Sequence, residues 1–178
     1  MIDERHERLI LVDETDRETG TAGKLEAHEK ARLHRAFSVL LHDGRGNWLL
    51  QRRAPGKYHS GGLWTNTCCG HPRPGEPVTA AARRRLGEEM GIDCELRFLE
   101  TNRYRVAFDN GLTENEIVHI HLGIYSGAVD ADPAEAMDWE WVAGEAIPAR
   151  VAATPERYSY WFRKYVEEVW DRLLAEVV

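Results

Sequence analysis

The possible folds and functions of this chain are limited most by residues 64–91, which read WTNTCCGHPRPGEPVTAAARRRLGEEMG. The first part of this segment carries two adjacent thiols and an imidazole, from Cys68, Cys69 and His71. The second part is typical of a loop followed by a helix, with paired carboxylates near the helix end. A thiol, a histidine and a carboxylate-bearing helix this close together predict a metal-assisted site for a charged small molecule.

We predict a helix over residues 77–90. Pro77 suits a first helical position, and Gly91 suits the residue that ends the helix. Arg85 and Glu89 lie one turn apart and therefore face the same way. Apolar residues at every fourth position form the stripe that packs on the core: Val78, Ala82, Leu86 and Met90.

Apolar or alternating segments predict strands along the rest of the chain: residues 8–12, 36–41, 47–51, 94–108 (one or two strands), 114–125 and 138–142. The Asp43-Gly44 turn joins residues 36–41 and 47–51 as a hairpin. Residues 13–23 are polar and predict a turn region, whereas residues 155–178 predict one C-terminal helix. Strands interleaved with a few helices favour a mixed α/β (α+β) fold with a partly antiparallel sheet.

The chain has 178 residues, which fits a single domain 1–178, with a core of roughly residues 34–165 and an N-terminal strand and loop, 1–33. The formal net charge of −7 disfavours a nucleic-acid partner. Apolar runs long enough to cross a membrane are absent from the sequence. Charges in the first residues disfavour a signal peptide, and three cysteines, two of them adjacent, fit a reducing cytoplasm.

Two carboxylates, from Glu114 and Glu116, lie two positions apart on a predicted strand and therefore share a face. Like charges this close repel unless a cation lies between them or one is protonated. An isolated pair of this kind is usually a solvated strand face. Here the apolar neighbours Ile117 and Val118 favour a pair that is buried or lines a cleft.

Histidines at positions 28, 34 and 71 could join these glutamates around one divalent metal. A mixture of imidazole and carboxylate ligands suits zinc, manganese or iron. A single histidine is more often structural, and we give that interpretation to His119 and His121.

Cys69 would share a side with His71 in an extended chain. A thiol beside a cation or metal has a lowered pKa and becomes a better base or nucleophile. A free cysteine is also commonly a small buried hydrophobic residue, and the residues alone leave these two interpretations level.

Basic residues cluster near the glycine-rich segment of this acidic chain: Lys24, Arg52, Arg53, Lys57, Arg83, Arg84 and Arg85. Such a cluster favours a phosphate or diphosphate site. A magnesium ion held by Glu89 would be the expected partner of a diphosphate. Arg83 is the member most consistent with simple solvation.

Residues 75–92 resemble a degraded Nudix box, the motif of diphosphate-cleaving hydrolases. Ala81 and Arg85 stand where that motif has acidic residues, whereas Glu88 and Glu89 remain. A hydrolase that needs those carboxylates to hold metal and activate water would be crippled.

The same losses are found in type I isopentenyl-diphosphate isomerases, a Nudix-fold family that this chain resembles over nearly its whole length. The matching motifs occur in the right order: residues 32–38, 64–72, 103–105, 113–116 and 158–161. The resemblance implies a Nudix-like mixed sheet flanked by helices, with an N-terminal extension. It also implies conversion of isopentenyl diphosphate to dimethylallyl diphosphate, a small-molecule reaction in isoprenoid biosynthesis that requires neither nucleic acid nor a membrane.

Residue roles follow from the resemblance, position by position. Cys69 and Glu116 would be the acid and base, in either order, and Tyr104 would orient Glu116. One divalent metal, Mn²⁺ or Zn²⁺, would be bound by His28, His34, His71, Glu114 and Glu116. Glu89 would hold a diphosphate-bound Mg²⁺ together with the backbone carbonyl of Cys69. The diphosphate would be gripped by Lys24, Arg53, Lys57 and Arg85, and Trp161 would cover the hydrocarbon end.

Alternatives remain at this stage. The adjacent Cys68 could be the working thiol, although the Cys-Gly-His register favours Cys69. Trp161 could be an ordinary core residue of a helix. The main rival function is a Nudix hydrolase of a diphosphate-containing substrate, and a second rival is a non-catalytic metal or diphosphate-binding module. We expect a monomer or a weak homodimer.

Overall fold

The computed structural model describes residues 7–177, so the first six residues of the predicted N-terminal extension and Val178 of the predicted C-terminal helix lie outside the described part. Strands are β1 Arg8–Val12, β2 Glu18–Gly23, β3 His34–His42, β4 Asn47–Arg53, β5 Trp64–Thr65, β6 Cys68–Gly70, β7 Arg97–Ala107, β8 Thr113–Ile124 and β9 Ala136–Ala143. Helices are α1 Lys24–Glu29, α2 Val78–Met90, α3 Ile147–Ala153, α4 Tyr160–Glu168 and α5 Trp170–Ala175, with 3₁₀ turns at Gly144–Ala146 and Pro155–Arg157.

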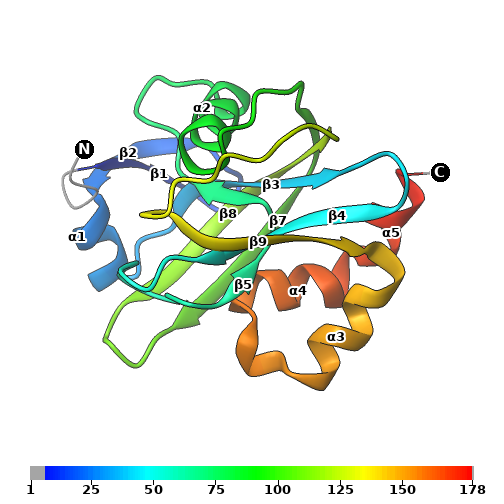
Figure 1. The fold of residues 1–178 in the computed structure, drawn as a ribbon. Helices are drawn as coiled ribbons and strands as arrows, with labels where there is room; N and C mark the ends of the chain where they lie inside the picture. Colours follow the sequence, from blue (N-terminus) through cyan, green and yellow to red (C-terminus); the bar gives the residue numbers. More distant parts are fainter. Residues whose placement is uncertain (1–6, 178) are drawn as a thin grey trace.

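Nine strands within residues 7–177 form one mixed sheet centred on β3 (Figure 1). Strand β3 pairs in parallel with β8 along its whole length, from His34 opposite Glu116 to His42 opposite Ile124. The other pairings of the sheet are antiparallel, including β7 with β8 and β4 with β9. This mixed sheet flanked by helices confirms the predicted fold class.

Side chains of β3 alternate between two cores on opposite faces of the sheet. Phe37 and Val39 pack beneath α2, against Leu86 and its neighbours. Leu40 points to the other face, where it joins a cluster with Phe162 and the rest of the C-terminal helices. Burying each side chain of this size contributes about 1.5–3 kcal/mol. Figure 1 shows the result: α2 on one side of the sheet and α3 to α5 on the other.

Helix α2 follows the prediction closely. Pro77 is the residue before the helix rather than its first turn, with an extended backbone. Gly91 ends the helix with φ +66°, in the left-handed region that favours glycine. A Cβ atom there would lie 2.5 Å from the backbone oxygen of Asp130. Glycine is therefore required by both the backbone angle and the neighbouring chain.

Two predictions of secondary structure are wrong in part, and one helix was not predicted. Residues 18–23 form strand β2, whose polar composition reflects its exposed position as an edge partner of β1. The predicted hairpin exists, but β3 and β4 pair only at His42 and Trp48, since their main partners are β8 and β9. Helix α3 was not predicted at all.

The single helix expected over residues 155–178 is also wrong, because the chain is divided there into a 3₁₀ turn, α4 and α5. Tyr158 is extended and bridges to Trp64, and the Ser159 amide donates to the Trp64 carbonyl at 2.9 Å. Ser159 then caps α4 by accepting from the Phe162 amide. A long-range contact thus delays the start of the helix. Within residues 7–177, no helix is both long and apolar enough to cross a membrane.

Candidate active site

A pocket opens between β3, the loop after β4, α2, β7, β8 and α4, where elements distant in the sequence meet. The structure brings most of the predicted site residues to its wall: Lys24, Arg53, Lys57, Cys69, His71, Arg85, Glu89, Tyr104, Glu114, Glu116 and Trp161. His28 and His34 do not line the pocket. Both are fully buried and contribute to a cluster directly behind the wall.

The two glutamates of β8 are buried, with 3% of Glu114 and 5% of Glu116 exposed. They share a face because strand side chains alternate, as predicted. The parallel register places His34 of β3 directly opposite Glu116, and the antiparallel register places Tyr104 of β7 opposite it on the other side. The sheet therefore determines which groups can reach the carboxylates.

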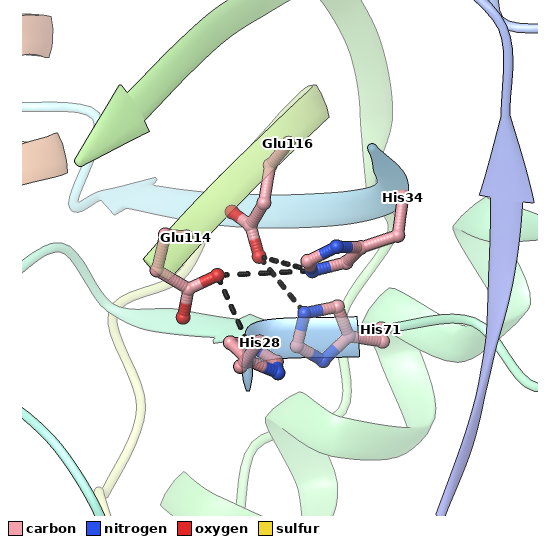
Figure 2. A group of neighbouring side chains, drawn as sticks. All are labelled: His28, His34, His71, Glu114 and Glu116. Atoms are coloured by element: carbon pink, nitrogen blue, oxygen red, sulfur yellow. Dashed lines mark hydrogen bonds and ion pairs between the residues drawn. The ribbon is translucent and has the colours of Figure 1, made fainter. Parts of the chain in front are cut away.

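Three imidazoles meet these carboxylates, and Figure 2 shows all five side chains pointing toward one another. His28 Nε2 lies 3.1 Å from Glu114 Oε2, and His71 Nε2 lies 2.9 Å from Glu116 Oε1. His34 Nε2 lies 3.3 Å from Glu116 Oε1 and 3.7 Å from Glu114 Oε2. One ligand atom from each of the five residues falls within 4.8 Å of all the others.

The tautomers of two of these histidines suit metal binding. Nδ1 of His28 donates to the carbonyl of Lys24 at 2.6 Å, and Nδ1 of His34 donates to the carbonyl of Arg32 at 2.8 Å. A carbonyl can only accept, so each Nδ1 carries the proton and each Nε2 directs a lone pair into the cluster. His34 Nε2 is buried and makes no well-directed hydrogen bond within the described residues. This donor set fits a divalent cation.

Electrostatics keep the glutamates ionised. Burial opposes ionisation of Glu114, but the adjacent imidazoles of His28 and His59 hold its pKa well below the usual range. Burial and the charge of Glu114 oppose ionisation of Glu116, but the adjacent imidazoles of His34 and His71 lower its pKa overall. Two buried carboxylates this close require nearby positive charge, which a bound cation would supply.

Cys69 faces the pocket, whereas Cys68 is fully buried in the core beneath α2. The Cys69 thiol donates to Asn66 Oδ1 at 3.3 Å and lies 3.3 Å from the hydroxyl of Ser38. Burial raises the pKa of Cys69 to about 12, against the opposing effect of these hydrogen bonds. Cys69 is therefore a protonated thiol at neutral pH, unlike the activated thiolate that one interpretation of the sequence expected.

Tyr104 and Trp161 complete the wall of the pocket. The Tyr104 hydroxyl donates to Glu116 Oε2 at 2.5 Å. Burial and the neighbouring carboxylates raise the pKa of Tyr104 well above its usual value, so the hydroxyl keeps its proton. Trp161 is 3% exposed, and its ring lies 5.3 Å from the Arg53 guanidinium. It is both a core residue and part of the pocket wall.

Cations gather at the other end of the pocket. Arg85 donates to Glu89 Oε1 at 2.5 Å, as their shared helix face predicted, and lies 3.3 Å from Glu135. Glu135 also pairs with Lys57. Burial opposes the charge of Arg85, but the carboxylates of Glu89 and Glu135 raise its pKa overall. Gln51 donates to the second oxygen of Glu89 at 2.9 Å.

The sequence analysis missed several residues of the pocket wall, among them Ser38, Tyr58 and His59, and it also missed Glu135, which pairs with Lys57. His59 Nε2 lies 2.6 Å from Glu114 Oε1, and the Tyr58 hydroxyl lies 3.2 Å from His28 Nε2. Tyr58 and His59 belong to a loop without periodic pattern, so nothing in the sequence indicated their direction. The histidine itself, five residues before the cysteine motif at residues 64–72, was the one available signal. His119 is structural as predicted, since it binds Asp16.

The fold and the pocket define the chain as a Nudix-domain protein. The NUDIX domain family model matches residues 32–164. A crystal structure from Deinococcus radiodurans superposes with a TM-score of 0.75 at 23% identity, covering 90% of this chain and 98% of that one. The MutT NUDIX hydrolase from Burkholderia pseudomallei gives a TM-score of 0.61 at 22% identity, covering 77% and 98%. These two likenesses concern the fold alone.

Curated relatives are much more similar in sequence. The isopentenyl-diphosphate Delta-isomerase of Burkholderia multivorans is 51% identical over 161 residues, which cover 90% of this chain and 92% of the relative. The isopentenyl-diphosphate Delta-isomerase 2 of Photorhabdus laumondii is 45% identical over 175 residues, covering 94% and 99%. The chain belongs to the isopentenyl-diphosphate Delta-isomerase family, as its motifs predicted, and is an enzyme.

Proposed function

We propose that this protein converts isopentenyl diphosphate to dimethylallyl diphosphate. The observation that carries the proposal is one pocket that holds a protonated thiol, a buried carboxylate and a cationic end, in a chain of the isomerase family. The reaction moves a double bond. A proton is added to the terminal alkene carbon and another is removed from the carbon nearer the diphosphate, so the substrate gains and loses one proton.

Cys69 and Glu116 are the proposed proton-handling groups. An alkene is a very weak base, so the reaction needs a strong acid and a pocket that excludes water. Two assignments fit the pocket. In one, the Cys69 thiol supplies the proton and the Glu116 carboxylate removes the other. In the second, Glu116 in its acid form supplies the proton and Cys69 removes the other. In both, Tyr104 holds Glu116 in place through its hydroxyl.

Two metals belong to the proposal. Mn²⁺ or Zn²⁺ would be held by His28, His34, His71, Glu114 and Glu116, whose donor atoms converge. Mg²⁺ would be held by Glu89 and the Cys69 carbonyl together with the diphosphate. The metal in the histidine site would acidify the Glu116 carboxyl group, and Mg²⁺ would neutralise diphosphate charge.

The remaining residues bind and orient the substrate. Lys24, Arg53, Lys57 and Arg85 would contact the diphosphate, which takes no part in the proton transfers but fixes the distance of the reacting carbons from Cys69 and Glu116. Trp161 would cover the hydrocarbon end. The protonated substrate has tertiary carbocation character, and an indole ring stabilises such a charge through its quadrupole.

The Nudix hydrolase alternative is not favoured. Arg85 replaces an acidic residue of the hydrolase motif and neutralises the Glu89 carboxylate that remains. We further propose a cytoplasmic enzyme that acts as a monomer or weak homodimer. Support for a reducing compartment comes from the three cysteines, all of which are free.

The test is to incubate the purified protein with isopentenyl diphosphate and Mg²⁺ and to detect dimethylallyl diphosphate by proton NMR. Release of phosphate or pyrophosphate without isomerisation would instead indicate a hydrolase. Cys69→Ala and Cys68→Ala form a matched pair. We expect the first to abolish turnover while pyrophosphate binding survives, and the second to retain turnover. The opposite result would show that the wrong thiol was chosen.

A further inference from the structure

The two glutamates of the cluster use their oxygens in the same way. In Glu116, Oε1 faces His34 and His71, whereas Oε2 accepts from the Tyr104 hydroxyl at 2.5 Å. In Glu114, Oε2 faces His28 at 3.1 Å, whereas Oε1 lies 2.6 Å from His59 Nε2. Each carboxylate therefore has one inner oxygen directed at the imidazoles and one outer oxygen held by a separate group.

Hydrogen-bond chemistry identifies His59 as a donor rather than a fourth imidazole ligand. An ionised carboxylate can only accept, so the proton between His59 Nε2 and Glu114 Oε1 belongs to the imidazole. The other ring nitrogen, Nδ1, lies 3.2 Å from the hydroxyl of Ser60, which can donate to it. His28 and His34 have the opposite arrangement, with Nδ1 protonated and a lone pair on Nε2.

The ring of His59 is held firmly in this orientation. It stacks on Phe108 with centroids 4.7 Å apart and planes inclined by 11°. Trp161 contacts it edge to face at 5.7 Å. Arg53 donates to the His59 backbone carbonyl at 3.3 Å, and only 5% of the imidazole is exposed. A donor fixed by packing on several sides can fix the carboxylate that it binds.

We propose that His59 is a positioning residue that holds the outer oxygen of Glu114, so that Glu114 presents a single oxygen to the metal, as Tyr104 does for Glu116. This inference rests on the proposed metal role of the cluster. A carboxylate without its outer hydrogen bond is free to rotate and to present either oxygen. Loss of such an outer donor weakens metal binding by about 10-fold to 100-fold in characterised sites.

Two substitutions separate the hydrogen bond from the packing. His59→Phe keeps a flat ring against Phe108 but removes the donor. His59→Gln removes the ring but keeps an amide N–H that can reach Glu114. The metal-free protein is titrated with MnCl₂ alone, without diphosphate. The EPR signal of free Mn²⁺ gives the fraction bound at each point and hence the affinity. We expect about 10-fold to 100-fold weaker binding for His59→Phe and recovery of most of the affinity for His59→Gln.

The outcomes are distinguishable. Wild-type protein that fails to bind Mn²⁺ would overturn the proposed metal role itself. Wild-type binding with unchanged affinity in His59→Phe would overturn only the role of His59. A merely structural role predicts that the unfolding temperature of the metal-free variants falls in parallel with affinity. Our proposal predicts instead that the two readouts separate, because His59→Gln loses the stack on Phe108 and keeps most of the affinity, whereas His59→Phe keeps the stack and loses affinity.

Discussion

The two ends of the pocket hold their charges in different ways. At the histidine end, side chains from α1, β3, β8 and the residue that follows β6 converge, and every charged or ligating group of the cluster is buried. At the cationic end, the long side chains of Lys57 and Arg85 already bind carboxylates of the protein. The first end therefore suits a cation that stays bound, and the second suits the proposed diphosphate, which would exchange with the internal carboxylates.

The energetic consequences differ accordingly. Burying two carboxylates side by side is costly, and the cost is relieved by a cation between them. At the cationic end, Lys57 and Arg85 already pair with carboxylates, so the proposed diphosphate would compete with Glu89 and Glu135. Changes at the histidine end should therefore affect the chemistry and stability, whereas changes at the cationic end should affect substrate affinity.

The largest effect is expected for Glu116→Gln, which removes the charge while keeping the shape. A positioned acid or base contributes about 10²–10⁴-fold to rate, so turnover should fall by at least that amount. The affinity for inorganic pyrophosphate with Mg²⁺ should change little, because that ligand is proposed to bind at the cationic end. NMR monitors the isomerisation and gives the turnover, and a separate pyrophosphate titration gives the affinity. A variant with normal turnover and weak pyrophosphate binding would reverse the assignment of the two ends.

Metal removal should come next in size. Treating the protein with a chelator and then restoring MnCl₂ at about one hundred times its dissociation constant should raise the free energy of unfolding by about 2.7 kcal/mol. Urea denaturation measures this difference. His71→Ala is the control, since the variant lacks one ligand and should lose most of the metal-dependent stabilisation. Equal stabilisation of wild type and His71→Ala would place the ion elsewhere.

The sequence predicted best those parts of the pocket that depend on local periodicity. The two-residue period of β8 placed Glu114 and Glu116 on one face, and the helical spacing of α2 placed Arg85 beside Glu89. Both relations lie within one element, so backbone geometry alone determines them.

Contacts between loops could not be predicted in this way. Lys57 and Glu135 are 78 positions apart, and no pattern links the segments that carry them. His59 reaches Glu114 because its loop packs on Phe108 and Trp161, which is a tertiary effect. The extended Tyr158 that delays α4 has the same origin, a bridge to Trp64. The contacts that could not be predicted from the sequence are therefore determined by tertiary packing rather than by local secondary-structure propensity.

Arg85→Gln should give an intermediate effect at the cationic end. The guanidinium is mostly buried between Glu89 and Glu135, so its loss removes a cation that the diphosphate would contact. Breaking a charge-assisted contact costs about 1.5–3 kcal/mol, which corresponds to roughly 10-fold to 150-fold weaker binding. Calorimetric titration with pyrophosphate and Mg²⁺ measures this loss of affinity. Arg83→Gln on the same helix is the matched control, because Arg83 is exposed and pairs with the surface residue Asp93.

We expect the smallest effect for Glu135→Gln. This substitution tests most directly whether a carboxylate of the protein competes with the diphosphate for Lys57 and Arg85. The neutral amide no longer competes with a diphosphate for Lys57 and Arg85, although Arg85 keeps Glu89. Partly exposed ion pairs contribute about 0–1 kcal/mol, so pyrophosphate affinity without Mg²⁺ should rise by at most a few fold. The same titration with Mg²⁺ is the comparison. Weaker binding of pyrophosphate only when Mg²⁺ is present would contradict the competition argument, because it would make Glu135 a partner of the metal rather than a competitor of the substrate.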